Sequence, residues 1–205
     1  MYKVYSRPGS GSFVVEAALE MAGAPFECID VPKTPQPDLG FLEISPLNQV
    51  PALALPDGHT MTESAAICIL LAERFPQAAL APADGAGRAD FLRWMALMAS
   101  VVYPADLRFY YADRYTTDAG GADAVKQAAI AEMDRGLAVM DAALGGRRWL
   151  AGERQSVADL YLLMLFSWHP EVERAREAWK NIERVCAVLR DQPLIKRLNV
   201  RHEMW

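Results

Sequence analysis

Three short stretches of the sequence combine residue types that could bind or activate a small anion. The first holds Ser10 and Ser12, in a loop of Pro, Gly and Ser between a strand-like run and a helix-like run. A hydroxyl at a helix N-terminus can cap the helix by accepting hydrogen bonds from its first N–H groups. It can also donate to an anion, which the positive end of the helix dipole favours. The two roles are compatible for one of these serines but not for both at once.

The second stretch is NQVPAL, residues 48–53, in which Pro51 directly precedes a strand-like run. Proline cannot donate to a strand ladder, so it marks the start or the edge of a strand. If the Val50–Pro51 bond is cis, the N–H and C=O of Val50 turn outward and can pair with an extended ligand. Gln49 can hydrogen-bond that ligand, or it can serve as an ordinary surface residue.

The third stretch places Glu63 and Ser64 at the start of a helix-like run. The N–H groups and the dipole of a helix N-terminus favour a carboxylate there. The acidic Glu63 fits such a site only if the ligand also carries an ammonium group. Taken together, the three stretches predict a site for a short peptide-like anion.

Other common chemistries lack the residues that they need. The histidines His59, His169 and His202 are isolated and no two cysteines are close, so no metal-ligand spacing is present. Neither a Walker-type phosphate loop nor a Gly-x-Ser-x-Gly nucleophile motif occurs. A Gly-Ser-Gly run resembles a dinucleotide fingerprint, but the third glycine is replaced by Val14, whose branched side chain would hold helix and strand apart.

The composition is that of a globular protein, and its net charge bears on the class of partner. The chain has 205 residues, of which 52% are hydrophobic and 23% charged, and its net charge is −5. This charge argues against nucleic acid and against an anionic membrane surface. No signal peptide and no apolar run of membrane-spanning length is found, and three distant cysteines suggest a reducing compartment. We therefore expect a cytoplasmic protein.

The elements that must position these residues fall into two groups. Residues 1–76 alternate in the order βαβαββα, whereas we find no convincing strand after them. Residues 77–87 read as a linker and residues 88–205 as an all-helical domain. The ranges predicted as strands are 2–6, 26–31, 52–55 and 59–62, and those predicted as helices are 11–22, 38–44, 64–75, 88–112, 122–144 and 156–168, with a proline-rich loop at 32–37 and two or three helices in the tail.

This pattern resembles the cytosolic glutathione transferase family over essentially the whole chain. The resemblance rests on the Val50-Pro51 pair before the third strand, the Glu63-Ser64 pair before the third helix, the linker, and a capping box. That box is the SVAD motif starting at Ser156. The resemblance implies a thioredoxin-like N-terminal domain, an all-helical C-terminal domain and a homodimer. It also implies glutathione as co-substrate and no metal.

The resemblance assigns a role to each stretch. Val50 pairs with the cysteinyl backbone of glutathione, while Glu63 and Ser64 hold its γ-glutamyl end, which carries both an ammonium and a carboxylate. Pro8-Gly9-Ser10 is similar to the serine-type members, which makes Ser10 the favoured thiol-activating residue and Ser12 the alternative. Gly11 stands where cysteine-type members carry their cysteine, so cysteine-dependent chemistry is not expected. Tyr5 is a third candidate, although packing in the core explains it better.

The sequence departs from the family pattern at Asn48, and one further region bears on the second substrate. The family often has Gly where this chain has Asn48, and asparagine can also adopt the left-handed conformation of that turn. Around the helix-kinking Pro104, an aromatic cluster with one arginine suits a planar or acidic electrophile between the domains, with Tyr103 and Arg108 as pocket residues. Core packing and a dimer interface are the alternative explanation for this cluster.

The expected function is that of a glutathione transferase. It would direct the glutathione thiolate at a small hydrophobic or aromatic electrophile. A non-catalytic binding or regulatory protein on the same fold, or a glutathione-dependent isomerase or lyase, would use the same residues.

Overall fold

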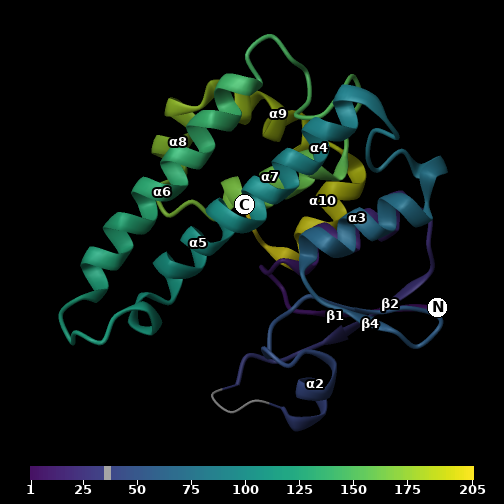
Figure 1. Cartoon of the computed structure of the whole chain (residues 1–205), viewed down its shortest axis with the longest axis horizontal. Coiled ribbons are helices and arrows are strands. Elements are labelled where there is room, and N and C mark those ends of the chain that lie inside the picture. The colour runs from purple at the N-terminus through teal and green to yellow at the C-terminus, as the bar shows by residue number, and fades with distance from the viewer. Residues whose placement is uncertain (35–37) are drawn as a thin grey trace. The chain divides into compact units, whose positions relative to one another are not determined.

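The computed structural model describes residues 1–34 and 38–205 of the chain, which form two compact units (Figure 1). The first unit comprises Met1–Ala81 together with Asp191–Trp205, and the second comprises Pro82–Arg190. These units differ from the predicted division into 1–76, 77–87 and 88–205, since the C-terminal tail joins the first unit. Part of the predicted loop at 32–37 lies outside the described residues.

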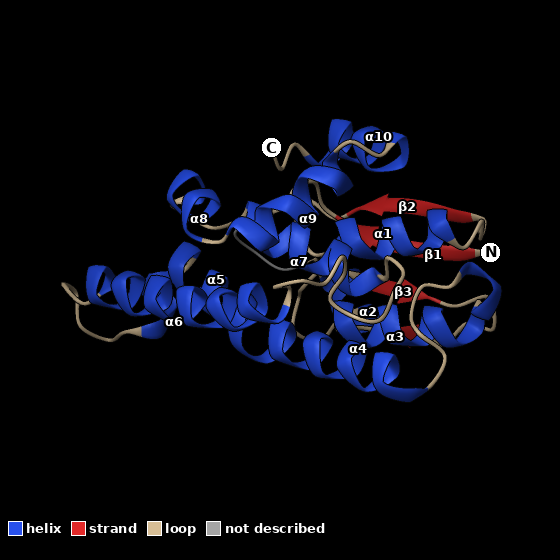
Figure 2. Ribbon diagram, turned by 90° about the horizontal axis from the view of Figure 1, so that it is seen from above, coloured by secondary structure: helices blue, strands red, loops and turns tan. Residues whose placement is uncertain are grey.

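The first unit is built on a four-stranded sheet in the order β2-β1-β3-β4. Its strands, drawn in red in Figure 2, are β1 (Tyr2–Ser6), β2 (Phe26–Asp30), β3 (Ala52–Ala54) and β4 (Thr60–Met61). β1 pairs in parallel with β2, and the other pairs are antiparallel. The predicted βαβαββα order and thioredoxin-like topology are therefore confirmed.

Four helices belong to the first unit: α1 (Ser12–Met21), α2 (Leu39–Ile44), α3 (Ser64–Arg74) and α10 (Pro193–His202). α1 contacts β1, α3 and α10, which is why its first eight residues are all buried. It ends where Gly23 adopts a left-handed φ of 62° and donates to the carbonyl of Glu20. α2 begins after Asp38, whose side chain accepts from the N–H groups of Gly40 and Phe41.

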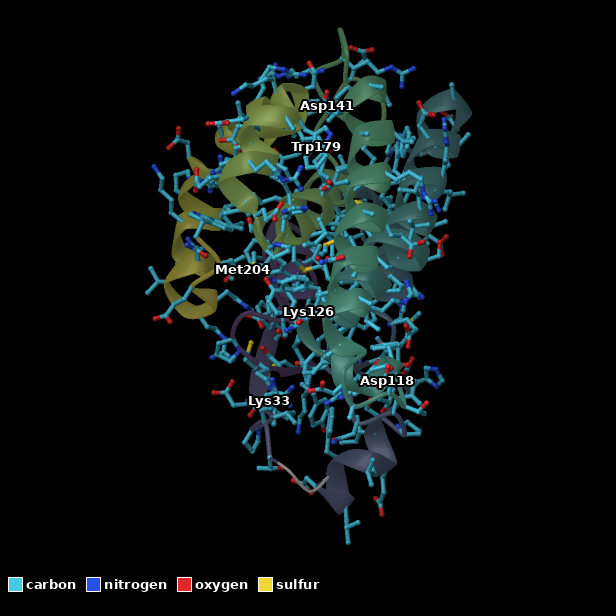
Figure 3. All side chains as sticks on the ribbon, turned by 90° about the vertical axis from the view of Figure 1, so that its left-hand side faces the viewer. Lys33, Asp118, Lys126, Asp141, Trp179 and Met204 are labelled. Atoms are coloured by element: carbon cyan, nitrogen blue, oxygen red, sulfur yellow. The ribbon has the colours of Figure 1, made fainter. Side chains whose placement is uncertain are left out.

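The second unit is helical. Its α-helices are α4 (Gly85–Leu97), α5 (Tyr103–Tyr110), α6 (Ala122–Ala143), α7 (Val157–Ser167), α8 (Val172–Ala178) and α9 (Lys180–Arg190). Ten consecutive residues of α7 are buried, so this apolar helix forms the centre of the core. Asp141 at the end of α6 accepts from the N–H groups of Asn181 and Ile182 and so caps α9 (Figure 3).

The capping box predicted ahead of α7 is present. The N–H of Ser156 donates to Asp159 Oδ2 over 2.8 Å, and the Ser156 hydroxyl lies 3.0 Å from the same oxygen. The other oxygen of Asp159 accepts from the N–H of Leu150 at 2.9 Å. One buried carboxylate thus fixes both the start of α7 and the loop that leads to it.

The helix predicted at 88–112 is divided. α4 already begins at Gly85, inside the predicted linker, and a π-helical turn at Met98–Val102 separates it from α5. Pro104 follows at the beginning of α5 and has no N–H to donate to the preceding turn. Gly87 and Pro82 pack closely in this segment: a Cβ on Gly87 would lie 3.1 Å from the Pro82 side chain.

Within residues 1–34 and 38–205, no helix is both long and apolar enough to cross a bilayer. The same residues contain no cluster of three or more His, Cys, Asp or Glu side chains placed to hold a metal ion.

Candidate functional site

The strand register brings the three predicted stretches to one end of the sheet. Tyr5, near the end of β1, pairs with Ala52 at the beginning of β3. Leu53 pairs with Met61 at the end of β4, two residues before Glu63. The loop after β1, the residues before β3 and the residues after β4 therefore all leave the sheet at the same end, although they are far apart in sequence.

The turn before β3 has two unusual backbone features. The Val50–Pro51 bond is cis, and Asn48 has a φ of 54°, the left-handed conformation expected of it. The Ser45 hydroxyl donates to the carbonyl of Gln49 over 2.8 Å and accepts from the N–H of the same residue at 3.2 Å. Val50 is half-buried and Gln49 exposed, so the turn presents Gln49 to solvent.

Glu63 and Ser64 lie at the beginning of α3 as predicted. Glu63 is exposed, has a φ of 65° and makes no capping hydrogen bond with its side chain. A left-handed φ is strained for a residue with a Cβ, and such residues are concentrated at functional sites. Ser64 is the first residue of the helix and is 6% exposed. The pair therefore combines an outward carboxylate with the positive end of the α3 dipole.

Ser10, in the loop after β1, and Ser12, at the start of α1, differ in burial and in their hydrogen-bond partners. The half-buried Ser10 hydroxyl donates to the carbonyl of Arg7 over 2.6 Å, and its oxygen accepts from the N–H of Ser12 at 3.3 Å. Ser12 is fully buried, and its oxygen lies 2.9 Å from the hydroxyls of both Ser10 and Ser6. The Ser12 oxygen also lies 3.3 Å from Arg7 N and 3.1 Å from Arg7 O.

A buried carboxylate behind this loop was missed by the sequence analysis. The Ser6 hydroxyl donates to Glu16 Oε1 over 2.5 Å, and Glu16 is 1% exposed. Burial raises the pKa of the Glu16 carboxyl, but hydrogen bonding with His202 and Ser6 and the charge of Arg201 outweigh it and leave the pKa below its ordinary value. The sequence did contain a signal, because Glu16 is the one acidic residue within the apolar run 13–19. In the structure all residues of that run are buried.

The remaining candidates lie elsewhere. Tyr5 packs against Phe41, with ring centroids 5.8 Å apart, as expected of a core aromatic. Tyr103 and Arg108 lie on α5 in the second unit. At about 100° per residue, a spacing of five positions turns their side chains roughly 140° apart around the helix. This geometry does not bring the two side chains to one face.

Their contacts differ accordingly. Tyr103 packs near the ring of Trp168, at a centroid distance of 5.4 Å. Arg108 pairs with Glu132 on α6 at 3.0 Å, so its charge already has a partner within the second unit.

Two family models match this chain. The model described as the N-terminal domain of glutathione S-transferase matches residues 12–74, and the model described as its C-terminal domain matches residues 93–193. The first match spans most of the sheet, with the turn before β3 and the start of α3. The second spans most of the second unit.

Individual proteins agree with the models. An uncharacterised GST-like protein, YncG, of Escherichia coli (strain K12) is 30% identical over 209 residues, which is 100% of both chains. A maleylacetoacetate isomerase of Pseudomonas aeruginosa is 27% identical and covers 92% of this chain and 90% of its own. A solved sphingomonad glutathione S-transferase complexed with glutathione is 28% identical, covers 99% of this chain and 100% of its own, and superposes with a TM-score of 0.84.

Proposed function

The chain belongs to the glutathione S-transferase family of enzymes, and from this premise we propose that its first unit binds glutathione and stabilises the thiolate with the Ser10 hydroxyl. The observation that carries the proposal is the convergence, at one end of the sheet, of the Ser10 loop, the Val50 backbone and the beginning of α3. A similar solved structure holds glutathione, which supports the same ligand here.

Each stretch meets a different part of the tripeptide in this proposal. The N–H and C=O of Val50, before Pro51, pair with the cysteinyl backbone, and the exposed Gln49 hydrogen-bonds the ligand. The γ-glutamyl carboxylate is held by Ser64 and the α3 N-terminus. The γ-glutamyl ammonium is held by Glu63, whose side chain is exposed and takes no part in capping.

The chemical task is to ionise a thiol near neutral pH. A free thiol has a pKa of about 8.5, so only a few per cent is ionised at pH 7. Lowering the pKa by about two units requires roughly 2.7 kcal/mol of differential stabilisation of the thiolate. A charge-assisted hydrogen bond from Ser10 and the positive end of the α1 dipole can together supply an effect of this size.

Ser10 suits this role better than Ser12. Ser12 is fully buried, and four polar atoms surround its oxygen. Ser10 is half-buried and can release the Arg7 carbonyl in order to donate to a sulfur instead. Ser12 therefore acts as support for Ser10 in this proposal.

We further propose that the thiolate attacks a small hydrophobic or aromatic electrophile, with Tyr103 and Arg108 contributing to its pocket from different sides of α5. The ring of Tyr103 beside Trp168 supplies an aromatic surface. Arg108 would act with its guanidinium held by Glu132. We also propose that the protein is cytoplasmic and forms a homodimer. All three cysteines are free, which supports a reducing compartment.

A glutathione-dependent isomerase is the second candidate. The similarity to a maleylacetoacetate isomerase over 92% of the chain favours it specifically. This activity would use the same thiolate, so the two candidates differ only in their products. A transferase would form glutathione conjugates from a panel of electrophiles, whereas an isomerase would convert a cis-configured unsaturated diketo acid to its trans isomer. A non-catalytic binding protein would bind glutathione and turn over none of these compounds.

The decisive experiment is calorimetric binding of glutathione, together with a pH titration of the ultraviolet absorbance of the bound thiolate. We expect binding with a thiol pKa well below that of free glutathione. Ser10→Ala should raise the bound thiol pKa by about one to two units and lower kcat/KM about 100-fold, with nearly unchanged affinity.

Two results would refute this assignment. Absence of glutathione binding would exclude the proposed function altogether. A silent Ser10→Ala variant beside an inactive Ser12→Ala variant would transfer the activating role to Ser12.

A further inference from the structure

The first unit buries a charged cluster directly behind the candidate site. Its centre is Glu16 on α1, whose Oε2 lies 3.2 Å from His202 Nε2 and 3.6 Å from Arg201 Nε on α10. Both of these partners come from the C-terminal tail. Arg201 is also bound to Asp30 at the end of β2. The tail thus supplies the positive charge that Glu16 requires.

A chain of hydroxyls connects this cluster to the candidate site. The Ser6 hydroxyl donates to Glu16 over 2.5 Å, and oxygen-to-oxygen distances of 2.9 Å separate Ser6 from Ser12 and Ser12 from Ser10. Each hydroxyl has one proton to donate. Because the Ser6 proton is committed to Glu16, a hydrogen bond between Ser6 and Ser12 must use the proton of Ser12, for which the Arg7 carbonyl also competes. Only the Ser10 proton is then available at the outer end of the chain.

On the premise that Ser10 donates to the glutathione thiolate, we propose that Glu16 is a positioning residue that opposes ionisation of the bound thiol by drawing the hydroxyl protons inward through Ser6 and Ser12. The inference therefore rests on the proposed function and deepens it. Glu16 itself touches neither the sulfur nor the electrophile in this proposal. It acts only through the hydroxyls and through its charge.

The argument follows from the number of protons. With a carboxylate at one end and a thiolate at the other, the three hydroxyl protons must serve four contacts: sulfur to Ser10, Ser10 to Ser12, Ser12 to Ser6, and Ser6 to Glu16. One contact always lacks a proton. The Arg7 carbonyl competes for the same protons, since it accepts from both Ser10 and Ser12. Two anions therefore destabilise each other along this chain.

Removing the charge of Glu16 should favour the thiolate for two reasons. A neutral amide accepts from Ser6 less strongly than a carboxylate, so the hydroxyl protons are drawn inward less. A negative charge also leaves a buried region near the site, where it had compensated the charge of Arg201. Both effects lower the pKa of the bound thiol, so the sign of the result does not depend on their relative sizes.

Four other charged or titratable groups lie near Glu16. His202 and Arg201 face it from α10, and Cys28 and Asp30 face the cluster from β2. Burial and the charge of Glu16 raise the pKa of the Cys28 thiol to about 12, so this thiol stays neutral over the range in which the substrate thiol titrates.

The test uses the full-length protein with the isosteric substitution Glu16→Gln. The pKa of bound glutathione is read from its thiolate absorbance and from the pH profile of kcat/KM. We expect this pKa to fall by about half to one unit, with a corresponding rise in the thiolate fraction below the pKa. An unchanged or raised thiol pKa in a folded Glu16→Gln variant would overturn the proposal.

A second variant, Ser6→Ala, tests whether Glu16 acts on the thiol pKa through the hydroxyls. Its result can be read even if Glu16→Gln does not fold. Ser6→Ala leaves the ion pairs of Glu16 in place and interrupts the chain. It should also lower the thiol pKa, but by less than Glu16→Gln, because the charge remains. The double variant should show less than the sum of the two shifts. Additive shifts, or no shift in Ser6→Ala, would overturn the hydroxyl route.

Glu20→Gln is the matched control. Glu20 lies one turn later on α1 and pairs with Arg197 on α10, one turn before Arg201, but it makes no contact with the hydroxyl chain. It should leave the thiol pKa unchanged. If wild-type protein binds no glutathione, the proposed function and this inference are both refuted. Normal wild-type binding with a Ser10-dependent pKa, but no response to Glu16→Gln, refutes the inference alone.

Discussion

Each of the two compact units buries a carboxylate on a helix, and their surroundings differ in nearly every respect. Glu16 in the first unit is 1% exposed and Asp106 in the second is 2% exposed. Glu16 accepts from Ser6 and faces Arg201 and His202. Neither carboxylate oxygen of Asp106 has a hydrogen-bond partner among the described residues.

The comparison separates burial from charge. Burial raises the pKa of both carboxyls, because the charged form loses its hydration. For Asp106 no other effect counters it, so its pKa lies well above the ordinary value. For Glu16 the positive partners outweigh burial, so the group is ionised. The first unit thus keeps a buried charge, and it does so directly behind the candidate site.

The largest effect that tests this comparison is the loss of stability on neutralising Glu16. Glu16→Gln removes the buried counter-charge of Arg201, and we expect the free energy of unfolding at pH 7 to fall by about 2 kcal/mol. Asp30 still pairs with Arg201, which limits the cost. Urea unfolding monitored by circular dichroism measures it.

The pH dependence of this difference has a defined sign. The folded pKa of Glu16 is lowered, so its contribution is present above the unfolded value of 4.5 and is lost as the pH falls through the folded pKa. The wild-type advantage over Glu16→Gln should therefore shrink in acid. An advantage that is constant down to pH 3 would mean that Glu16 stabilises the fold by packing rather than by charge.

Replacing Asp106 should change the free energy of unfolding in the opposite direction to Glu16→Gln, and by less. Replacing it with leucine removes an unpartnered polar group from the core, so Asp106→Leu should raise the free energy of unfolding by about 1 kcal/mol at pH 8. Because its folded pKa is raised, the contribution of Asp106 is fully present below the unfolded value of 3.8 and is lost as the pH rises toward the folded pKa.

Asp106→Asn is the matched control for this prediction. It keeps a polar side chain of the same shape but cannot ionise, so it should reduce the decline of stability with rising pH without the full gain of leucine. If Asp106→Leu is instead destabilising by several kcal/mol at every pH, Asp106 has a partner that the helix packing hides, and the contrast with Glu16 fails.

Local signals in the sequence predicted much of the first unit and of the candidate site. Asn48 takes the left-handed conformation expected from its place in the turn, and Ser156 opens the expected capping box. Glu63 directly precedes the first residue of α3, as predicted. In each case the relevant physics acts within a few residues, so residue type and spacing are sufficient to predict it.

What escaped prediction depends on contacts between distant segments. Glu16 is followed by Arg201 only 185 positions later, and no periodicity indicates that the last helix of the chain packs on α1 in the first unit. The break between α4 and α5 at Met98–Val102 was likewise predicted only as a kink at Pro104. The role of Ser12 became visible only when Ser6 was found beside it.

The smallest predicted effect is that of Glu20→Gln on the free energy of unfolding. It tests whether burial is what makes the ion pair of Glu16 different. Glu20 repeats the same arrangement one turn later: a glutamate on α1 paired with an arginine on α10, at 3.1 Å. Its side chain is 34% exposed and that of Arg197 is 60% exposed, whereas the Glu16 side chain is 2% exposed. Exposed pairs contribute little, so Glu20→Gln should change the free energy of unfolding by no more than about 0.5 kcal/mol, and added salt should abolish the difference. A cost equal to that of Glu16→Gln would show that the contact between α1 and α10 depends on charge at any depth. The stabilising role of Glu16 would then no longer follow from its burial.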